Sequence, residues 1–459
     1  MTSTVRALLA ALLIAGAAVG GAYVVGLRGA AGAQAEPVFA ALPAPETAAA
    51  ATLAYRTLET SYYKDVSGQA LVDGERKALA ATLAHAHVKG ALPVEAVAVL
   101  DPRSGDGAAA GKTLSDAEAY ASALGAGGAE TLKESALRGM LASIGDPYTT
   151  YLSQRENREL SESLTGGNFG GIGVYIEQLK DKRIVLLPIE GLPAYRAGMK
   201  QVEIVSAVDG TRVAGLSLDR IEQLIRGTVG TTVHLSTAPY KAPTKAHTFD
   251  IVRQTILVPT VRAKMENGID YIRLSDFGST SADEVRKALL EGRSKNARGY
   301  ILDLRDNGGG LVNAAVDISS FFIRSGTIVS TISRDGDRED ERAHGTVITG
   351  LSPLVVLVNK YTASASEITS GALQDYHLAT LIGTKTFGKG VVQSIYPMRD
   401  GGALKITTQR YVTPAGRDIQ HRGIVPDIIV DQDDDPSLID TPKDKQLAAA
   451  KARLAQIAR

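Results

Sequence analysis

Apolar and polar positions change their spacing several times along the chain, and each change marks a predicted boundary. Residues 7–27 form an uncharged, mostly apolar run between Arg6 and Arg28. About twenty such residues are enough to cross a bilayer as a helix, and the following Ala33-Gln34-Ala35 has the small-residue spacing of a signal-peptidase site. Residues 1–35 are therefore expected to be a signal peptide or a membrane anchor. Both interpretations place the rest of the chain outside the cytoplasm.

Residues 36–165 are expected to contain a linker and an N-terminal helical region. The linker is rich in Ala, Gly and Pro, and from about residue 51 to residue 152 the apolar spacing is mainly helical. Within this region, residues 105–128 hold many Gly, Ala and Ser residues. That composition predicts a loop or a poorly ordered insertion.

Residues 166–256 have a different pattern, with short β-branched runs, glycine turns and one helical segment. The helical segment lies near Ser217 to Arg226, where Leu218, Ile221 and Ile225 share one face. This stretch predicts a β domain that contains one helix.

From residue 257 onward, strands and helices alternate. The pair Asn267-Gly268 between two β-rich runs predicts a hairpin, and Ser281 with Glu284 has the spacing of a capping box at a helix start. The alternation predicts an α/β domain with a mixed sheet over residues 257–432, followed by a helical tail over residues 433–459. The whole chain is therefore expected to be a multidomain α/β protein.

Two short apolar runs in this α/β domain have the composition of strands buried in a central sheet. They cover residues 300–304 and 354–358, and residues 311–322 between them are expected to form a helix. The segments that follow these two strands carry the candidate chemistry.

The composition excludes several kinds of chemistry. Among 459 residues there is no cysteine, so no disulfide, thiolate nucleophile, thiolate zinc site or iron–sulfur cluster is possible. Acidic and basic residues number 50 each, and this balance argues against a general nucleic-acid binder. The hydrophobic share of 44% is sufficient to bury substantial cores.

A serine at a strand-to-helix junction has two interpretations. Ser364 follows the strand at 354–358, and Glu367 three residues later completes the pattern of a helix-capping box. Alternatively, the serine is a nucleophile at the positive end of the helix, where a developing oxyanion is stabilised. Ser366 competes for either role, and spacing alone favours the cap.

A serine nucleophile needs a base, and the sequence favours a lysine over a histidine. His377, thirteen residues along the predicted helix, would lie about 19 Å from Ser364. Lys389 stands between two glycines that allow close approach of the backbone. Its pKa must fall by roughly three units, or about 4 kcal/mol, which burial can supply. Gln393 is placed to orient the amine. The alternative interpretation of Lys389 is a surface lysine in a glycine turn.

The glycine turn, residues 306–310, is Asp306-Asn307-Gly308-Gly309-Gly310 between a strand and a helix. It is either an ordinary βα connection or an oxyanion hole made of backbone N–H groups. Residues 383–389 match the first seven positions of a phosphate-binding P-loop, but Gly390 stands where Ser or Thr should hold magnesium. A strand-like run follows instead of a helix, so an NTPase is not predicted.

Two segments resemble the carboxyl-terminal processing peptidases, also called tail-specific Ser/Lys peptidases: Thr362-Ala363-Ser364-Ala365-Ser366-Glu367-Ile368 and Thr386-Phe387-Gly388-Lys389-Gly390-Val391-Val392-Gln393. The resemblance implies that Ser364 is the nucleophile, Lys389 the base and Gln393 the residue that orients the base. It also implies oxyanion-hole N–H groups from Ala365 and Gly309, with Gly310 as the alternative to Gly309. No metal or organic cofactor is implied.

A third segment, Gly170-Gly171-Ile172-Gly173-Val174, resembles the carboxylate-binding loop of the family's PDZ domain. The resemblance implies that residues 166–256 are a PDZ domain. The N–H groups of Gly171, Ile172, Gly173 and Val174 would then receive the substrate's C-terminal carboxylate. Arg226, at the end of the groove helix, would contact or sense the peptide, and an exposed helix-end arginine is the alternative. The core is expected to be of ClpP/crotonase-like type.

The family also implies a function and partners. It implies a serine endopeptidase of the cell envelope, periplasmic or otherwise extracytoplasmic, that cleaves proteins recognised by exposed C-terminal tails. The resemblance further suggests a homodimer and an activator or adaptor protein. The balanced charge predicts no nucleic-acid partner. A non-catalytic PDZ adaptor or chaperone-like scaffold is one alternative, and a hydrolase of small esters or lactams is another.

Three departures from the family pattern stand out. Gln201-Val202-Glu203-Ile204 lacks the turn glycine usual before the PDZ Asp-Gly, and Gly308 replaces a proline that is frequent in the oxyanion turn. About 60 residues, near 70–128, enlarge the N-terminal region. The family gives no account of these extra residues.

Overall fold

The computed structural model describes residues 24–25, 46–86, 106–123, 128–164, 169–179, 181–256, 259–350, 352–432 and 438–457. The chain forms two compact units, so it is a multidomain α/β protein. The core unit consists of Met1–Glu159 together with Val261–Arg459, and the inserted unit is Leu160–Thr260. The chain therefore leaves the core unit once and returns to it.

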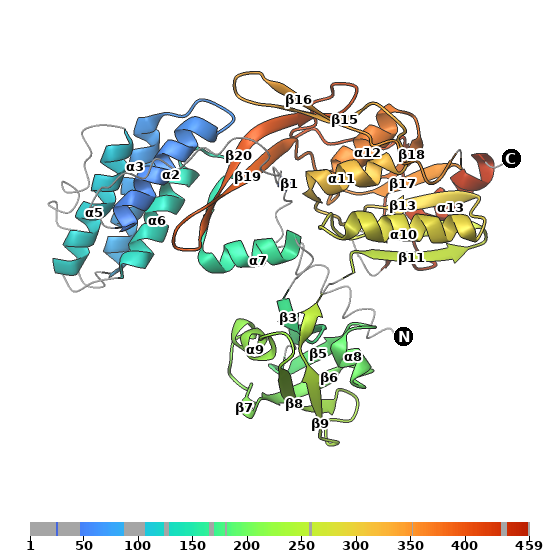
Figure 1. Ribbon diagram of the computed structural model, residues 1–459, viewed down its shortest axis with the longest axis horizontal. Helices are drawn as coiled ribbons and strands as arrows, with labels where there is room; N and C mark the ends of the chain where they lie inside the picture. Colours follow the sequence, from blue (N-terminus) through green and yellow to red (C-terminus); the bar gives the residue numbers. More distant parts are fainter. Residues whose placement is uncertain are drawn as a thin grey trace. The chain divides into compact units, whose positions relative to one another are not determined.

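The N-terminal part of the core unit is a group of packed helices (Figure 1). They are α2 (Glu46–Ser61), α3 (Gly68–Ala86), α5 (Gly107–Ala123) and α6 (Ala129–Ala142). Their shared core includes Leu58, Leu79, Leu114 and Leu137, each buried. The helical interpretation of this region is confirmed for the described residues.

The prediction of a loop over residues 105–128 was wrong, because most of that stretch is helix α5. Its small residues serve close packing instead of chain disorder. A Cβ at Gly111 would lie 2.4 Å from Thr52 Oγ1 on α2 and 3.0 Å from the Ala48 carbonyl oxygen. Small side chains at such a contact let two helix backbones approach closely, and Leu114 and Ala117 on the same helix are fully buried.

The inserted unit is built around an antiparallel sheet in the order β4-β5-β6-β8-β9. The helix predicted near Ser217 is present as α9, with the Ser217 side chain accepting a hydrogen bond from the Arg220 N–H. Ile221 and Ile225 of α9 lie in the core of this unit. Its elements are β3 (Phe169–Gly171), β4 (Val174–Gln178), β5 (Ile184–Pro188), α8 (Pro193–Arg196), β6 (Glu203–Val208), β7 (Thr211–Arg212), α9 (Leu218–Ile225), β8 (Thr232–Pro239), β9 (His247–Val252) and β10 (Gln254–Ile256). Helix α7 (Gln154–Leu164) spans the boundary between the two units.

The C-terminal part of the core unit contains a mixed sheet in the order β11-β12-β13-β17-β18-β21. Its strands are β11 (Val261–Glu266), β12 (Ile269–Leu274), β13 (Gly299–Asp303), β17 (Leu354–Val358), β18 (Ala379–Gly383) and β21 (Ile428–Ile429). The predicted hairpin joins β11 to β12, and the strands from β12 to β21 are parallel. The alternating pattern of the sequence is thus confirmed as an α/β arrangement.

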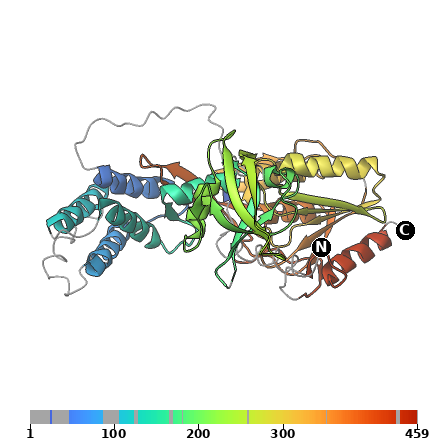
Figure 2. The ribbon, with the colours of Figure 1, turned by 90° about the horizontal axis from the view of Figure 1, so that it is seen from below.

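Helices cover both faces of this sheet. They are α10 (Ser281–Ser294), α11 (Val312–Ser320), α12 (Ala365–Asp375) and α13 (Lys445–Ile457). Figure 2 shows α10 and α13 on opposite sides of the sheet. Leu447 and Leu454 of α13 pack against Ile301 and Val355 of the central strands. The C-terminal helix therefore contributes to the hydrophobic core on one face of the mixed sheet.

The predicted capping box at Ser281 was wrong in detail. Thr280 is the residue before α10, and its hydroxyl donates to Glu284 Oε1 at 2.7 Å. The Ser281 hydroxyl instead donates to the Asp276 carbonyl oxygen at 2.9 Å and accepts from the Gly278 N–H at 2.8 Å. The Ser281 hydroxyl thus stabilises the turn at residues 276–278 instead of capping the helix.

A second sheet in the core unit has the order β14-β1-β19-β20-β15-β16, with β2 paired to β20. Its elements are β1 (Val24–Val25), β2 (Thr150–Leu152), β14 (Gly310–Leu311), β15 (Thr327–Ile332), β16 (Arg338–Arg342), β19 (Val391–Pro397) and β20 (Ala403–Val412). Strand β2 links the helical region to this sheet, because it directly follows α6 and pairs with β20.

Only two residues of the predicted signal or anchor segment are described, and they form strand β1. It runs parallel to β14 on one side and to β19 on the other. The rest of that segment lies outside the described residues. Among the helices described, none combines the length and the apolar character needed to span a membrane.

Candidate active site

Three neighbouring parallel strands deliver the candidate residues to one edge of the mixed sheet. Strand β13 leads into the glycine turn, β17 leads to Ser364, and β18 leads to Lys389. Strand β17 pairs with both β13 and β18. Because the carboxyl ends of parallel strands meet at the same edge, residues far apart in the sequence converge there.

Ser364 occupies a strained and buried position at the start of α12. Its backbone has φ 61° and ψ −118°, a conformation that a residue with a side chain rarely adopts. The residue is fully buried, and its Oγ has no hydrogen-bond partner among the described residues. Ser364 also stands at the capping-box position of α12, where its N–H donates to the Glu367 carboxylate. Ser366, the competing serine, donates its hydroxyl to the Asn307 carbonyl oxygen at 3.0 Å.

Glu367 connects the serine segment to the lysine segment. Its carboxylate accepts hydrogen bonds from the N–H groups of Ser364 (2.9 Å), Gly388 (2.8 Å) and Lys389 (2.9 Å), and from the Thr386 hydroxyl (2.5 Å). Burial raises the pKa of Glu367, whereas these four donors oppose that rise by favouring the carboxylate. Glu367, at the capping-box position, thus acts as a clamp between the serine segment and the lysine segment.

Tyr411 on β20 provides a second bridge between the two segments. Its hydroxyl donates to the carbonyl oxygens of Lys389 (2.6 Å) and Ser364 (3.1 Å). The Tyr411 side chain is itself fully buried. With Glu367 on the N–H groups and Tyr411 on the carbonyl groups, the backbones at residues 364 and 389 are held beside each other.

Lys389 lies in surroundings that favour its neutral amine. The side chain is fully buried, and burial followed by the positive charge of Lys405 lowers the pKa of Lys389 well below its usual value. Asp146 and Glu367 act in the opposite direction. The Nζ atom stands 4.8 Å from the centroid of the Tyr148 ring. A neutral lysine near pH 7 is able to accept a proton, which is what a base requires.

Gln393 lies in the same buried environment on β19. Its Nε2 donates to the Thr407 hydroxyl at 3.4 Å, and its Oε1 has no hydrogen-bond partner among the described residues. A buried amide oxygen that is left unbonded carries a free-energy cost. It is therefore available to accept a hydrogen bond from an amine.

The glycine turn brings backbone N–H groups close to Ser364. A Cβ at Gly309 would lie 2.7 Å from the Ser364 Cβ and 2.9 Å from the Ala365 nitrogen. Ala365 is the first residue of α12, where an N–H has no acceptor within the helix. The N–H of Gly309 donates to Asn307 Oδ1 at 2.9 Å. The predicted donors are thus together, but in this arrangement one of them is engaged by an asparagine.

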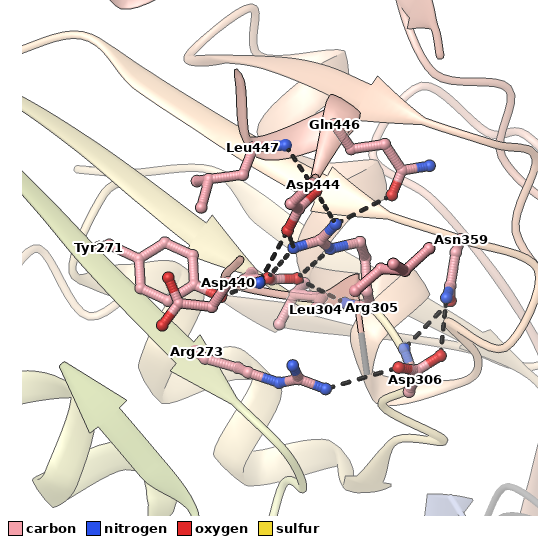
Figure 3. A network of polar contacts seen from close by, with 12 residues as sticks. Tyr271, Arg273, Leu304, Arg305, Asp306, Asn359, Asp440, Asp444, Gln446 and Leu447 are labelled. Atoms are coloured by element: carbon pink, nitrogen blue, oxygen red, sulfur yellow. Dashed lines mark hydrogen bonds and ion pairs between the residues drawn. The ribbon is translucent and has the colours of Figure 1, made fainter. Parts of the chain in front are cut away.

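Buried charges fix the strand and turn that carry these donors (Figure 3). The Arg305 guanidinium pairs with Asp303 at 2.6 Å and with Asp444, just before α13, at 2.8 Å. All three side chains are at most 1% exposed. Asn359, after β17, donates to Asp306 Oδ1 at 2.7 Å and accepts from the Asp306 N–H at 3.0 Å. The C-terminal helix and the serine loop therefore both brace the glycine turn.

The predicted peptide-binding residues lie in the inserted unit. Gly171 ends β3, and Val174 begins β4, which is the edge strand of its sheet. Between them, Ile172 is buried and Gly173 has φ 72°. Arg226 follows α9 and forms ion pairs with Glu162 and Glu222. These residues belong to a different unit from Ser364 and Lys389.

No role in the site was predicted from the sequence for several residues around Lys389 and Gln393. They are Asp146, Tyr148, Lys405, Thr407 and Tyr411. Asp146 and Tyr148 come from the loop after α6, whereas the other three lie on β20. A single local signal was available: the alternation of β20 places Lys405 and Thr407 on one face of a strand that reads as half-buried.

Comparisons with known proteins identify the family of this chain. The family model described as peptidase family S41 matches residues 268–430. The carboxy-terminal-processing protease of Bartonella bacilliformis is 38% identical over 310 residues, which are 66% of this chain and 70% of the relative. The carboxyl-terminal-processing protease of Synechocystis sp. is 38% identical over 327 residues, covering 69% of this chain and 75% of the relative.

A solved structure is also similar to this chain. It is titled photosystem II D1 C-terminal processing protease, is 27% identical and has a TM-score of 0.45, with coverage of 84% of this chain and 93% of that one. The two curated relatives carry the assignment, because each exceeds 30% identity over more than two thirds of its own length. The chain belongs to peptidase family S41, among the carboxyl-terminal-processing proteases, and is a serine-type peptidase.

Proposed function

We propose that this peptidase cleaves proteins with Ser364 as nucleophile, Lys389 as general base and Gln393 as the residue that orients the base. The observation that carries the proposal is the joint clamping of two buried segments by Glu367 and Tyr411. One segment presents a strained serine with an unbonded hydroxyl, and the other presents a lysine whose pKa is lowered by burial. A buried residue with a strongly shifted pKa, placed beside a potential nucleophile, is typical of an active site.

The proposed reaction proceeds by acyl transfer. Ser364 Oγ attacks the peptide carbonyl carbon while its proton passes to the neutral Lys389 amine. The resulting ammonium donates that proton to the leaving nitrogen, the C–N bond breaks, and an ester to Ser364 remains. Water then attacks the ester carbonyl and gives a proton to Lys389, which returns it to Ser364 Oγ as the new carboxyl product departs.

The developing oxyanion would be stabilised by the N–H groups of Ala365 and of the glycine turn. For Gly309 to serve, its N–H must leave Asn307 Oδ1, whereas Gly310 is the alternative donor. Each such donor contributes about 3–4 kcal/mol to transition-state stabilisation in related chemistry. We therefore propose that productive substrate binding includes a small rearrangement of this turn.

The substrate is proposed to lie as an extended strand between β14 and β19. Strand β1 of this chain occupies that position, with Val24 opposite Gly310 and Val25 opposite Gln393. An extended peptide placed there would run past the glycine turn on one side and the orienting glutamine on the other. The backbone pairing supplies affinity without demanding one side-chain sequence.

In the inserted unit, we propose a PDZ domain that binds the substrate's C-terminal tail. The edge strand β4 is able to accept an added strand, and the N–H groups of Gly171, Ile172, Gly173 and Val174 would receive the carboxylate. For Arg226 to contact the peptide, it must exchange one of its ion pairs with Glu162 or Glu222. An Arg226→Ala variant should then bind tail peptides more weakly than a Glu222→Ala variant.

The cellular setting is also a proposal. The apolar run at residues 7–27 supports export or membrane anchoring, which would place the peptidase in the cell envelope. A ClpP/crotonase-like core, a homodimer and an activator or adaptor protein follow from the family resemblance. Cell fractionation and light scattering of the purified protein test the location and the dimer.

The direct test compares Ser364→Ala and Lys389→Ala with the wild type on an unstructured protein. Both variants should lose cleavage while keeping the wild-type thermal unfolding temperature. Ser370→Ala is the matched control, because the Ser370 hydroxyl bonds within α12 to the Ser366 carbonyl oxygen. Full activity of Ser364→Ala would refute the mechanism.

Three further measurements separate the alternatives. Amidation of the substrate's C-terminal carboxylate should slow cleavage, and an unchanged rate would remove the tail-binding proposal. Peptide binding by the wild type without turnover, after candidate activators have been added, would favour a non-catalytic adaptor. Cleavage of small esters or lactams without cleavage of proteins would favour a small-molecule hydrolase.

A further inference from the structure

Strand β20 contains an irregularity at the point where it passes Gln393. Val392 pairs with Gln409, but Gln393 pairs with Thr407, so Thr408 is an extra residue in β20. Such a β-bulge bends the strand and redirects the side chains beside it. In a regular ladder Gln393 would face Thr408. The bulge instead places Thr407 directly opposite Gln393, inside the buried site.

Every polar group of Thr407 is bound, and most of its partners come from the N-terminal helical region. Its N–H donates to Thr149 Oγ1 at 3.0 Å, and its carbonyl oxygen accepts from the Tyr63 N–H at 3.0 Å. Its hydroxyl donates to Asp146 Oδ2 at 2.6 Å. The same hydroxyl accepts from Gln393 Nε2 at 3.4 Å. Thr407 therefore connects the loop after α6 to the orienting glutamine.

The directions of these hydrogen bonds determine how the Gln393 amide is turned. The Asp146 carboxylate accepts from the Tyr148 N–H and from the hydroxyls of Thr149 and Thr407. A carboxylate only accepts, so the single proton of the Thr407 hydroxyl is committed to Asp146. Only a lone pair then faces Gln393, which must present its NH₂ group. The Oε1 atom is left on the other side of the amide, unbonded within the described residues.

We propose that Asp146 and Thr407 are positioning residues that hold Gln393 Oε1 toward the Lys389 amine, so that the N-terminal helical region completes the catalytic centre. This inference rests on the proposed function of Ser364, Lys389 and Gln393. It assigns a role to the segment 146–149, which follows α6 and precedes β2. A flipped amide would turn an NH₂ group toward the lysine and remove its acceptor.

Several charged and titratable groups surround Lys389, and the test must distinguish them. Lys405 on β20 lowers the pKa of Lys389, while Asp146 and Glu367 raise it. The Tyr148 ring lies 4.8 Å from Nζ. Replacing Asp146 changes both the charge and the relay, whereas replacing Thr407 changes the relay alone. The two substitutions therefore give different pH signatures.

The first experiment uses Thr407→Val, which keeps the shape of the side chain and removes the hydroxyl. We expect kcat on an unstructured protein to fall about 10- to 100-fold, with an unchanged acid limb of the pH profile. Thr407→Ser should restore most of the activity. Thr408→Val is the matched control from the bulge itself, because the Thr408 hydroxyl shares a hydrogen bond of 3.0 Å with the Ser394 hydroxyl. Wild-type kcat in Thr407→Val would overturn the proposal.

The second experiment uses Asp146→Asn, which removes the negative charge with little change of shape. The loss of an anion disfavours the ammonium form of Lys389, so the acid limb of kcat/KM should move to lower pH while kcat falls. The charge of Asp146 alone accounts for the movement of the limb, so the fall in kcat is the part that tests positioning. Wild-type kcat in Asp146→Asn would count against the proposal. If Asp146→Asn does not fold, the Thr407 series decides.

A double-mutant cycle gives the decisive readout. If Thr407 acts through Gln393, adding Thr407→Val to Gln393→Ala should cause no further loss of kcat. Multiplication of the two single losses would show independent action and overturn the inference. Ser364→Ala separates this failure from failure of the proposed function. If Ser364→Ala is inactive while the cycle is multiplicative, the mechanism stands and only the relay is wrong.

Discussion

The carboxylate of Glu367 accepts a hydrogen bond from the backbone N–H of Lys389, with 2.9 Å between Oε2 and the nitrogen. Glu367 lies in the first turn of α12 and Lys389 lies between β18 and β19, so this contact sets the position of the lysine relative to the helix that follows Ser364. Glu367 is therefore more than the third position of a capping box. Its remaining donors come from both sides of the site.

Replacing Glu367 with glutamine should damage both activity and stability. An amide NH₂ group would face N–H donors that now point at a carboxylate, which leaves a buried donor unpaired at a cost of about 1–3 kcal/mol. We expect cleavage of an unstructured protein to fall at least ~100-fold, because displacement of the lysine by about 1 Å has effects of that size. Rates and thermal unfolding should be compared with Glu341→Gln, an exposed control. Wild-type rates in Glu367→Gln would contradict the clamp.

The pH dependence of kcat/KM should report the buried lysine pair. Burial lowers the pKa of Lys405 to about 8, and its charge in turn lowers the pKa of Lys389. Lys405→Met removes that charge, so the pKa of Lys389 should rise and the acid limb of kcat/KM should move to higher pH. Lys389→Arg should be inactive throughout, because arginine does not lose its proton. An acid limb that stays in place in Lys405→Met would exclude this coupling.

Gly309→Ala should abolish cleavage by steric conflict at the nucleophile. The residue has φ 105°, and the new Cβ would lie 2.7 Å from the Ser364 Cβ and 2.8 Å from the Ala363 carbonyl oxygen. Gly416→Ala is a matched control, since Gly416 has φ 77° but nothing within 4 Å of an added Cβ. In both variants the free energy of unfolding should fall by about 1–3 kcal/mol, because alanine is strained in this backbone conformation. Only Gly309→Ala should lose activity, and equal activity in the two variants would argue against a crowded oxyanion turn.

Breaking the buried ion pair with the C-terminal segment should have a large effect. Asp444→Ala leaves Arg305 without one of its carboxylates in a site that is at most 1% exposed, which costs about 3–5 kcal/mol. The glycine turn that follows Arg305 should loosen, and kcat should fall with the unfolding temperature. Lys264→Ala, which breaks the exposed pair with Asp440, should cost less than about 1 kcal/mol. Similar losses of unfolding free energy in Asp444→Ala and Lys264→Ala would show that the buried ion pair has no special importance.

The helical region should become less stable as pH rises. Glu75 on α3 is fully buried, and both of its carboxylate oxygens lack a hydrogen-bond partner among the described residues. Burial raises the pKa of Glu75 well above 4.5. Its neutral form therefore favours folding below the unfolded-state pKa, and this stability is lost as pH rises through the folded-state pKa. The loss approaches about 1.4 kcal/mol per pH unit in that window.

Glu75→Met should remove this slope, because an apolar side chain of similar length needs no partner. Thermal unfolding between pH 5 and pH 8 should show the largest stabilisation by the substitution at the higher pH. Glu134→Met on neighbouring α6, where the side chain is 36% exposed, is the control and should leave the slope intact. Parallel pH profiles for Glu75→Met and the wild type would show that this carboxylate does not titrate in the window.

The sequence was most informative where chemistry and structure depend on neighbouring residues. The Asn267-Gly268 hairpin, the helix after Ser217 and the buried strand at 354–358 were predicted because their signals lie within a few positions. Predictions failed where distant contacts outweighed local composition. Gly111 and its small neighbours form a helix because Thr52 and Ala48 of α2 lie against them, and nothing local announces that contact.

The sequence by itself determined the family, the identities of Ser364, Lys389 and Gln393 as candidates, and the alternation of strands and helices that builds the sheet. Only the tertiary structure decided that the Ser364 hydroxyl is unbonded, that Glu367 clamps the lysine loop, and that Asp146 reaches Thr407 across 261 positions. The physical reason is that motif residues are close in the chain, whereas burial and hydrogen-bond partners depend on segments brought together by the core. The lowered pKa of Lys389 belongs to that second class, because desolvation and the charge of Lys405 exist only in the folded protein.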